Sequence, residues 1–283
     1  MATLLTLRRR MKTTTNVSKT TKAMQMIAAS KLKKAQDSAE SSKPYVEKLN
    51  TLSKALEQRV DKDQLHQYML PQEEIKAKLL IVISPDKGLC GGLVTNLMKE
   101  VLHFSNTGKT YYITIGKKAE RSVASLNKDI VASFPFGTTL PPFEAVFPIA
   151  KLINEYFLGK KVSEVTILST KFNSIMSQMP MFNILLPVKL QEKAVLDKSA
   201  TLFEPSVDAL LPDLLQHYLE MVIYQSLLES YASEQGSRMI AMKNATDNAM
   251  DIISELRLEY NKTRQEKITN ELLDIGGGLV AYE

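Results

Sequence analysis

The 283-residue sequence has no tryptophan, a single cysteine and only three histidines. The single cysteine, Cys90, excludes a disulfide within the chain, and it permits a reducing compartment without requiring one. His66, His103 and His217 are scattered and have no cysteine or carboxylate cluster at ligand spacing, so we expect no metal site. No apolar run is long enough to span a bilayer, since the best of them, such as Leu79 to Ile83, are only as long as a strand.

Acidic residues are missing from the first 36 positions, which hold nine lysines and arginines. Four interpretations fit this composition: a mitochondrial transit peptide, a nucleic-acid-binding arm, a basic helical face that meets acidic protein partners, and a plain solvated helix face. No aromatic residue lies between the charges, and no RNA-binding or helix-turn-helix pattern is present. We therefore expect no nucleic-acid partner.

Proline is also missing from Asp213 to Ile275, where apolar residues recur every three or four positions. A helix of that length would be roughly 90 Å long, far more than one small core can bury. It must pair with another helix or enter another protein, although a coiled coil of no special purpose would show the same periodicity. The predicted seam has heptad-like spacing and consists of Met242, Ala245, Ala249, Ile252, Leu256 and Tyr260.

The segment from Leu4 to Val60 has the same spacing and predicts a second long helix. Its part from Thr13 to Thr21 is rich in threonine and serine, which are weak helix formers, so this part needs a partner. Pro44 predicts either a kink or a restart of the helix.

The centre of the chain changes period, and short apolar runs alternate there with helical patterns, which indicates a mostly parallel α/β layer. The fold class expected is α/β, with a long antiparallel two-helix coiled coil from the two terminal segments and a central Rossmann-like domain. The predicted strands cover 79–83, 111–115, 130–134, 165–169 and 181–188. The predicted domains are an N-terminal coiled-coil helix (1–60), the α/β domain (75–190), a C-terminal coiled-coil helix (210–276) and a flexible tail (277–283).

A glycine-rich turn follows the first predicted strand and precedes a helix, an arrangement that can cradle a phosphate. The spacing of Gly88, Gly91 and Gly92 fits neither a dinucleotide fingerprint nor a P-loop, so we expect the glycines to serve a tight turn and close packing. Cys90 could be a nucleophile, but no histidine lies near it in sequence, and a small buried thiol is commoner. We find no catalytic set and expect no cofactor.

Three blocks, Thr20–Leu32, Ser84–Gly92 and Ser233–Leu272, closely resemble the signatures of the γ subunit of F-type ATP synthases, in that family's order and across nearly the whole chain. The departures are Gly236 and the triple glycine Gly276–Gly278. Because the resemblance begins inside the basic N-terminal segment, it argues that this segment stays in the mature protein.

The resemblance implies a non-catalytic central-stalk rotor. It would turn inside the hexamer of α and β subunits and couple proton flow through the c-ring to ATP synthesis or hydrolysis on the β subunits. The implied partners are the α and β subunits, an ε-type subunit and the c-ring, with peripheral membrane association through the complex. We expect the cytoplasmic face of a bacterial inner membrane, the alternative being the matrix side of the mitochondrial inner membrane. The rival hypotheses are a coiled-coil adaptor with an α/β module and a phosphate-binding enzyme that uses the turn at Gly88.

The resemblance also implies contact residues. Glu204 matches a position on the c-ring and ε side, while Met24 has a spacing that equally suits the helix seam. Gly236 is expected to be a soft point in the C-terminal helix, through elastic compliance or through a close approach that admits no Cβ, and we favour compliance. The contacts implied with β subunits are Lys22, Met24, Lys31, Arg238, Arg264, Gln265, Thr269 and Glu271.

Overall fold

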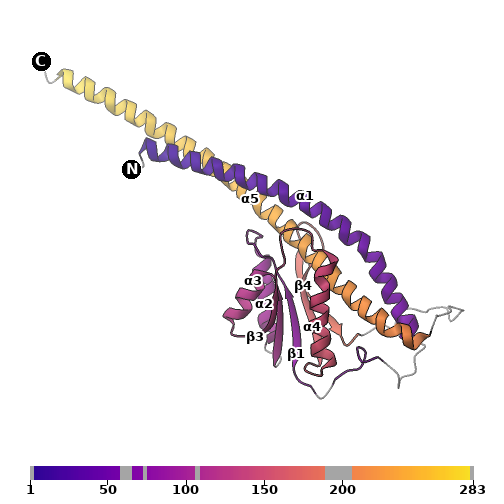
Figure 1. Cartoon of the computed structure of the whole chain (residues 1–283). Helices are drawn as coiled ribbons and strands as arrows, with labels where there is room; N and C mark the ends of the chain where they lie inside the picture. Colours follow the sequence, from indigo (N-terminus) through magenta and orange to yellow (C-terminus); the bar gives the residue numbers. More distant parts are fainter. Residues whose placement is uncertain (1–2, 58–65, 73–74, 106–108, 189–205, 281–283) are drawn as a thin grey trace. The chain divides into compact units, whose positions relative to one another are not determined.

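The chain folds as two long helices and a five-stranded sheet with its own helices (Figure 1). By its internal contacts it divides into two compact units, one formed by Met1–Ala28 with Met239–Glu283 and the other by Ala29–Arg238. The computed structural model describes residues 3–57, 66–72, 75–105, 109–188 and 206–280.

The sheet belongs to the second unit and has the strand order β3-β2-β1-β4-β5. Strands β3, β2, β1 and β4 run parallel to one another, and only the edge strand β5 is antiparallel to its neighbour β4, so the prediction of a mostly parallel sheet is confirmed. The elements are α1 (Leu4–Glu57), β1 (Lys78–Ile83), α2 (Leu93–Ser105), β2 (Thr110–Ile115), α3 (Lys117–Ser125), β3 (Asp129–Phe134), the short 3-10 helix η2 (Phe143–Ala145), α4 (Val146–Leu158), β4 (Glu164–Phe172), β5 (Gln178–Leu186) and α5 (Val207–Val280).

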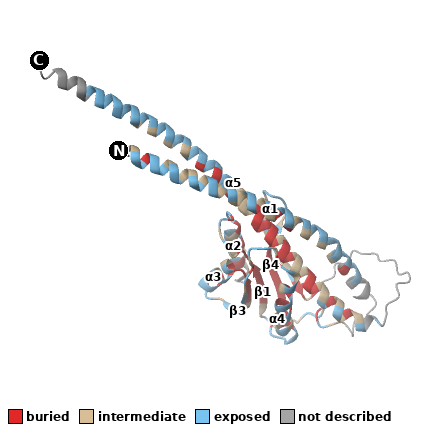
Figure 2. Cartoon of the chain, turned by 45° about the horizontal axis from the view of Figure 1, so that its top comes forward, coloured by how far each residue is buried: buried red, intermediate tan, exposed pale blue. Residues whose placement is uncertain are grey.

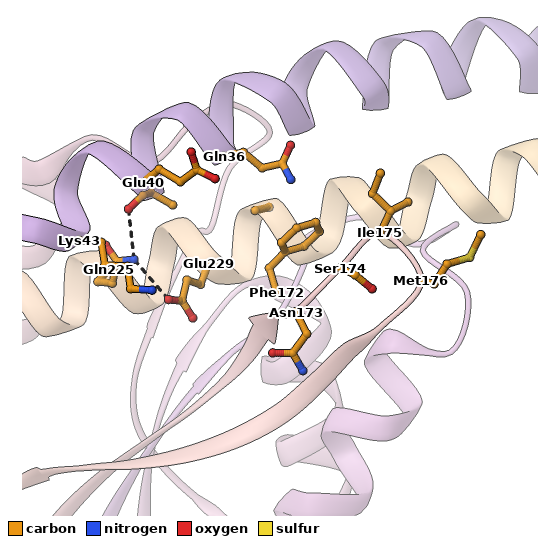
Figure 3. Close-up of a pocket in the computed structure, with 12 residues that line it drawn as sticks. Gln36, Glu40, Lys43, Phe172, Asn173, Ser174, Ile175, Met176, Gln225 and Glu229 are labelled. Carbon is orange, nitrogen blue, oxygen red and sulfur yellow. Dashed lines mark hydrogen bonds between the residues drawn. The ribbon is translucent and has the colours of Figure 1, made fainter.

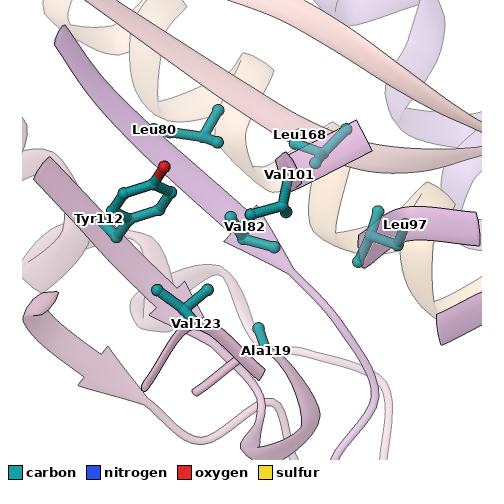
Figure 4. Close-up of a cluster of buried hydrophobic side chains, with 8 residues drawn as sticks. All are labelled: Leu80, Val82, Leu97, Val101, Tyr112, Ala119, Val123 and Leu168. Carbon is teal, nitrogen blue, oxygen red and sulfur yellow. The ribbon is translucent and has the colours of Figure 1, made fainter. Parts of the chain in front are cut away.

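Side chains that alternate along β1 serve the two faces of the sheet. Leu80 and Val82 join an apolar cluster with residues of α2 and α3, while α4 contacts β4 on the other side of the sheet (Figures 1 and 4). Burying one such side chain stabilises the fold by about 1.5–3 kcal/mol. The cluster consists of Leu80, Val82, Leu97, Val101, Tyr112, Ala119, Val123 and Leu168.

The first unit is an antiparallel pair of helix segments, in which the hydroxyl groups of Thr21 and Thr246 are 2.7 Å apart. Its seam holds small and polar side chains as well as apolar ones, and Thr246 is buried beside Met242 and Ala249. The predicted seam was wrong at Ile252, whose side chain is 46% exposed. The seam continues through Ile253 instead, since Thr246, Ala249, Ile253 and Leu256 are separated by alternating steps of three and four residues.

In the second unit, α1 and α5 are joined by polar contacts, among them a 2.5 Å hydrogen bond from the Ser42 hydroxyl to the side-chain oxygen of Gln225. Of the two alternatives predicted at Pro44, a kink or a restart, the restart is wrong, because α1 is one helix through that residue. Pro44 is exposed, so the carbonyl that loses its N–H donor there can be solvated.

Helix α5 is longer than the predicted 210–276. It begins at Val207, contains Pro212 near its start, and continues through the three glycines to Val280. Its residues change from mostly buried between Leu215 and Gly236 to wholly exposed between Arg264 and Leu273 (Figure 2).

Candidate partner-contact sites

The distal part of α5 carries the first group of predicted contact residues. Arg264, Gln265, Thr269 and Glu271 are all exposed. The carboxylate of Glu271 lies 3.5 Å from the ammonium group of Lys267, and the two side chains are 61% and 64% exposed. Exposed pairs of this kind are weak and exchange readily. These polar groups are therefore available to another protein.

Large apolar side chains share this exposed segment. Leu258, Ile268, Leu272 and Leu273 are all exposed, and Leu258 is 70% exposed. Ile268 and Leu272 are four residues apart and share one face of the helix. An exposed apolar surface of this kind suits contact with another protein. These apolar residues were not predicted as contacts. The usable signal was that the predicted C-terminal helix (210–276) is longer than the predicted N-terminal helix (1–60) and carries apolar residues near its end.

In α1, the three predicted contact residues differ in environment. Lys22 is exposed, and Met24 is half-buried beside Gln25, whose Oε1 atom is buried without a hydrogen-bond partner among the described residues. Lys31 belongs to the second unit and donates a 2.5 Å hydrogen bond to the carbonyl oxygen of Thr138. Contacts of all three with a partner stay predictions.

Arg238 differs most from the expectation of a free contact residue. Its Nη1 lies 2.6 Å from Oε1 of Glu234, one turn earlier on α5, and the two side chains are only 12% and 4% exposed. Its Nη2 donates to the carbonyl oxygens of Lys87 and Gly88, at 3.3 Å each. The structure thus gives Arg238 partners within its own chain, and a contact with a β subunit stays a prediction.

Burial sets the electrostatics of this region. The desolvation of Glu234 raises the pKa of its carboxyl group, while the charge and hydrogen bond of Arg238 act against that rise. Burial likewise raises the pKa of the Cys90 thiol. A nucleophilic cysteine needs a lowered pKa and access to solvent, so this environment is that of an inert packed thiol.

The glycine-rich turn is occupied by contacts of the chain with itself. The Ser237 hydroxyl donates a 2.6 Å hydrogen bond to the carbonyl oxygen of Cys90. Leu89 and Gly91 both have positive φ, of 63° and 57°. The positive φ of Gly91 fits the tight turn that the sequence predicted. A Cβ added there would lie 3.6 Å from Oγ of Ser237, which is an ordinary contact, so packing alone does not require a glycine at this position.

Asp86 of the same turn is a hydrogen-bond acceptor for three backbone N–H groups. Its carboxylate accepts from Lys117 and Gly137 at 2.8 Å and from Phe136 at 3.5 Å. Because Lys117 begins α3, Asp86 places a negative charge at the N-terminus of that helix. A carboxylate at this position repels a phosphate and stabilises the turn itself.

Gly236 lies against the end of β4. It is buried, and a Cβ added there would lie 3.1 Å from Cε2 of Phe172. The approach is therefore close but not closed to a Cβ, which would fit if the ring of Phe172 moved by a few tenths of an ångström. Phe172 also lines a groove of about 710 Å³ between α1, α5 and the turn after β4, together with Glu40, Lys43, Met176 and Glu229 (Figure 3).

Three further predictions concern a membrane-spanning helix, a metal site and Glu204. Across the described ranges, no helix is long and apolar enough to cross a membrane. The same residues contain no group of three or more histidine, cysteine or acidic side chains placed to hold a metal ion. Glu204 lies outside the described residues.

Comparison with known proteins assigns the family. The model of a family described as ATP synthase matches residues 3–282. A protein named ATP synthase gamma chain from Dehalococcoides mccartyi is 38% identical over 283 residues, with 99% of each chain covered. A protein of the same name from Aromatoleum aromaticum is 35% identical over 288 residues, covering 99% of this chain and all of that one.

Solved structures of ATP synthases contain chains with a similar fold. The chain is similar to one in the central stalk and c-ring of the mitochondrial ATP synthase of Tetrahymena thermophila, with a TM-score of 0.60 and 26% identity over 80% of this chain and 98% of that one. A chain of the mitochondrial ATP synthase of Euglena gracilis has a TM-score of 0.59 and 19% identity, covers 89% of this chain and 95% of its own, and supports the fold alone. With a family match from end to end and relatives of equal length, this chain belongs to the ATP synthase gamma chain family.

Proposed function

We propose that this chain is the central rotor shaft of an F-type ATP synthase and has no active site of its own. The observation that carries the proposal is the exposed end of α5, where polar and large apolar side chains stand together on a helix that is exposed on every side from Arg264 to Leu273. Such a segment suits insertion into another protein. The family of the chain supports α and β subunits as that protein.

In this function, proton flow turns the c-ring, the shaft turns with it, and its asymmetry imposes different conformations on the β subunits in turn. Arg264, Gln265, Thr269 and Glu271 are proposed to contact the β subunits, together with the basic residues Lys22 and Lys31 and with Met24. Each exposed contact is weak, so partners can be exchanged as the shaft rotates. Driving a β subunit almost completely from one state to the other requires a difference of roughly 5.5 kcal/mol between the contacts made in the two states.

An ε-type subunit and the c-ring are the proposed partners on the side of the α/β domain. Chains of the central stalk and c-ring assembly are among the structural relatives, which supports this placement. The bacterial relatives support the cytoplasmic face of the inner membrane as the location, with the matrix side of the mitochondrial inner membrane as the alternative.

Two truncations test the proposed contacts. Each would be expressed with α, β and ε-type subunits and reconstituted with the membrane sector, and ATP-driven proton pumping would be measured. Removal of residues 274–283 should leave assembly and pumping nearly intact, whereas removal of residues 264–283 also deletes Arg264, Gln265, Thr269 and Glu271 and should abolish most pumping. Equal pumping by the two truncated complexes would contradict the assignment of these residues.

A further inference from the structure

Helix α5 is attached to the α/β domain through polar contacts near the end of the second unit. The Ser230 hydroxyl accepts a hydrogen bond from the N–H of Thr170 at 3.3 Å, and the Ser233 hydroxyl donates to the carbonyl oxygen of Thr170 at 2.9 Å. One turn further, Ser237 and Arg238 bind the carbonyl groups of the glycine-rich turn. The helix is therefore tied to the end of β4 and to the turn that follows β1.

These attachments are directional, as is the 3.2 Å hydrogen bond from the Tyr231 hydroxyl to the carbonyl oxygen of Thr138, whereas much of the remaining buried surface of α5 is apolar. Leu215, Leu219, Ile223 and Leu227 bury apolar surface, and such burial has no preferred direction. Hydrogen bonds weaken steeply when donor and acceptor lose alignment. Rotation of α5 about its own axis would therefore disturb the polar contacts first.

Glu234 orients Arg238 for this attachment. It holds Nη1 of the guanidinium, so that Nη2 points to the carbonyl oxygens of Lys87 and Gly88. The fork of donors in arginine makes both sets of contacts at once, which a lysine ammonium on its flexible stem cannot reproduce with the same geometry. Gly236, between the two residues, lets the helix come close to Phe172.

We propose that Glu234, Ser237 and Arg238 form a clamp with the backbone of Lys87, Gly88 and Cys90, which locks the rotation of α5 to the α/β domain. Arg238 is the last residue of the second unit, so the clamp holds the final turn of α5 that belongs to this unit. This inference rests on the proposed function: torque received by the α/β domain passes into α5 through the clamp. Arg238 is then a positioning residue for torque transmission inside its own chain.

The test uses the complete synthase, reconstituted in vesicles with the unaltered chain and with three variants. Arg238→Met removes the donors and keeps an apolar stem, Ser237→Ala removes the contact with Cys90, and Arg238→Lys keeps only the charge. The matched control is Lys151→Met at an exposed position of α4. ATP hydrolysis, ATP-driven proton pumping and the yield of complex are measured for each.

With the clamp weakened, the rate of ATP hydrolysis and the yield of complex should stay near those of the unaltered chain while proton pumping falls. The reason is that α5 still turns inside the catalytic head but slips against the α/β domain. We expect the ratio of pumping to hydrolysis to fall roughly fivefold in Arg238→Met, since several hydrogen bonds to a charged group are lost. Arg238→Lys should recover only part of the ratio, and Lys151→Met should behave as the unaltered chain.

Two results would overturn the clamp. One is a ratio in Arg238→Met equal to that of the unaltered chain. The other is a parallel fall of hydrolysis, pumping and yield, which would mean that the residue serves folding alone. If the unaltered chain itself assembles with no α and β subunits, the proposed function fails first, and the clamp is refuted with it.

Discussion

Replacing Gly236 by alanine should stabilise the protein, whereas leucine at the same position should destabilise it. Alanine improves helix propensity by about 1 kcal/mol. Its buried methyl group adds about 0.8 kcal/mol. Against this, the new Cβ lies 3.1 Å from Cε2 of Phe172, so the ring must move by a few tenths of an ångström. Phe172 lines the groove of about 710 Å³, which gives its ring room to move.

The net gain expected for Gly236→Ala is about 0.5–1.5 kcal/mol, which corresponds to a rise in Tm of roughly 1–6 °C for a chain of this size. A leucine has nearly the helix propensity of alanine. Its larger side chain overfills the space beside Phe172 and should cost about 1–3 kcal/mol.

Unfolding of the purified chain by heat and by denaturant measures both variants. Asn248→Ala, at an exposed position of α5, is the control for helix propensity without a close contact. The reasoning is refuted if leucine stabilises as much as alanine, since that result would mean open space beside Gly236. A marked loss of stability in Gly236→Ala would show that the ring cannot move.

Further predictions concern Gln25, Asp86 and Cys90. Gln25→Leu should raise the free energy of unfolding by about 1 kcal/mol, because a buried oxygen without a partner among the described residues is replaced by an apolar group. Denaturant titration measures this change, and a loss of stability would contradict the burial of that oxygen. Asp86→Ala should cost about 1–3 kcal/mol, since three N–H groups lose their acceptor, and Asp86→Asn should cost less; equal stability of all three chains would refute this role. The raised pKa of Cys90 means that the folded chain holds the thiol proton to a higher pH than the unfolded chain does. The contribution of this thiol to the free energy of unfolding is therefore fully present below pH 9.0 and is lost as pH rises through the folded pKa. Cys90→Ala should therefore flatten the alkaline fall of the unfolding free energy, and an unchanged slope would contradict this.

The long helices and the parallel order of the sheet could be predicted because their patterns are local. Leu79 to Ile83 forms a continuous apolar run, and β1 indeed lies inside the sheet with a parallel strand on each side. The phase of the seam was harder to predict, because Ile252 and Ile253 are both apolar and adjacent. A buried threonine at position 246 decides the phase, and hydrophobic periodicity does not detect it.

The clamp could not be predicted from local pattern. Arg238 and Gly88 are 150 positions apart, and their contact depends on how α5 lies against the end of the sheet. The resemblance assigned Arg238 to a partner, because a basic residue in a shared motif gives no sign of whether its contact lies inside or outside the chain. The residues from Arg264 to Leu273 are the opposite case, because the structure gives them no burial within the chain. Their periodicity resembles that of the paired part of α5, so local pattern does not show that they are exposed.

The central claim is that this chain is a rotor shaft, and observation of rotation tests it most directly. Complexes of α and β subunits with this chain would be fixed to a surface through the β subunits, with a bead attached to an exposed position of the α/β domain. The account predicts unidirectional rotation of the bead on addition of ATP. ATP hydrolysis by the assembled complex with a stationary bead would contradict it.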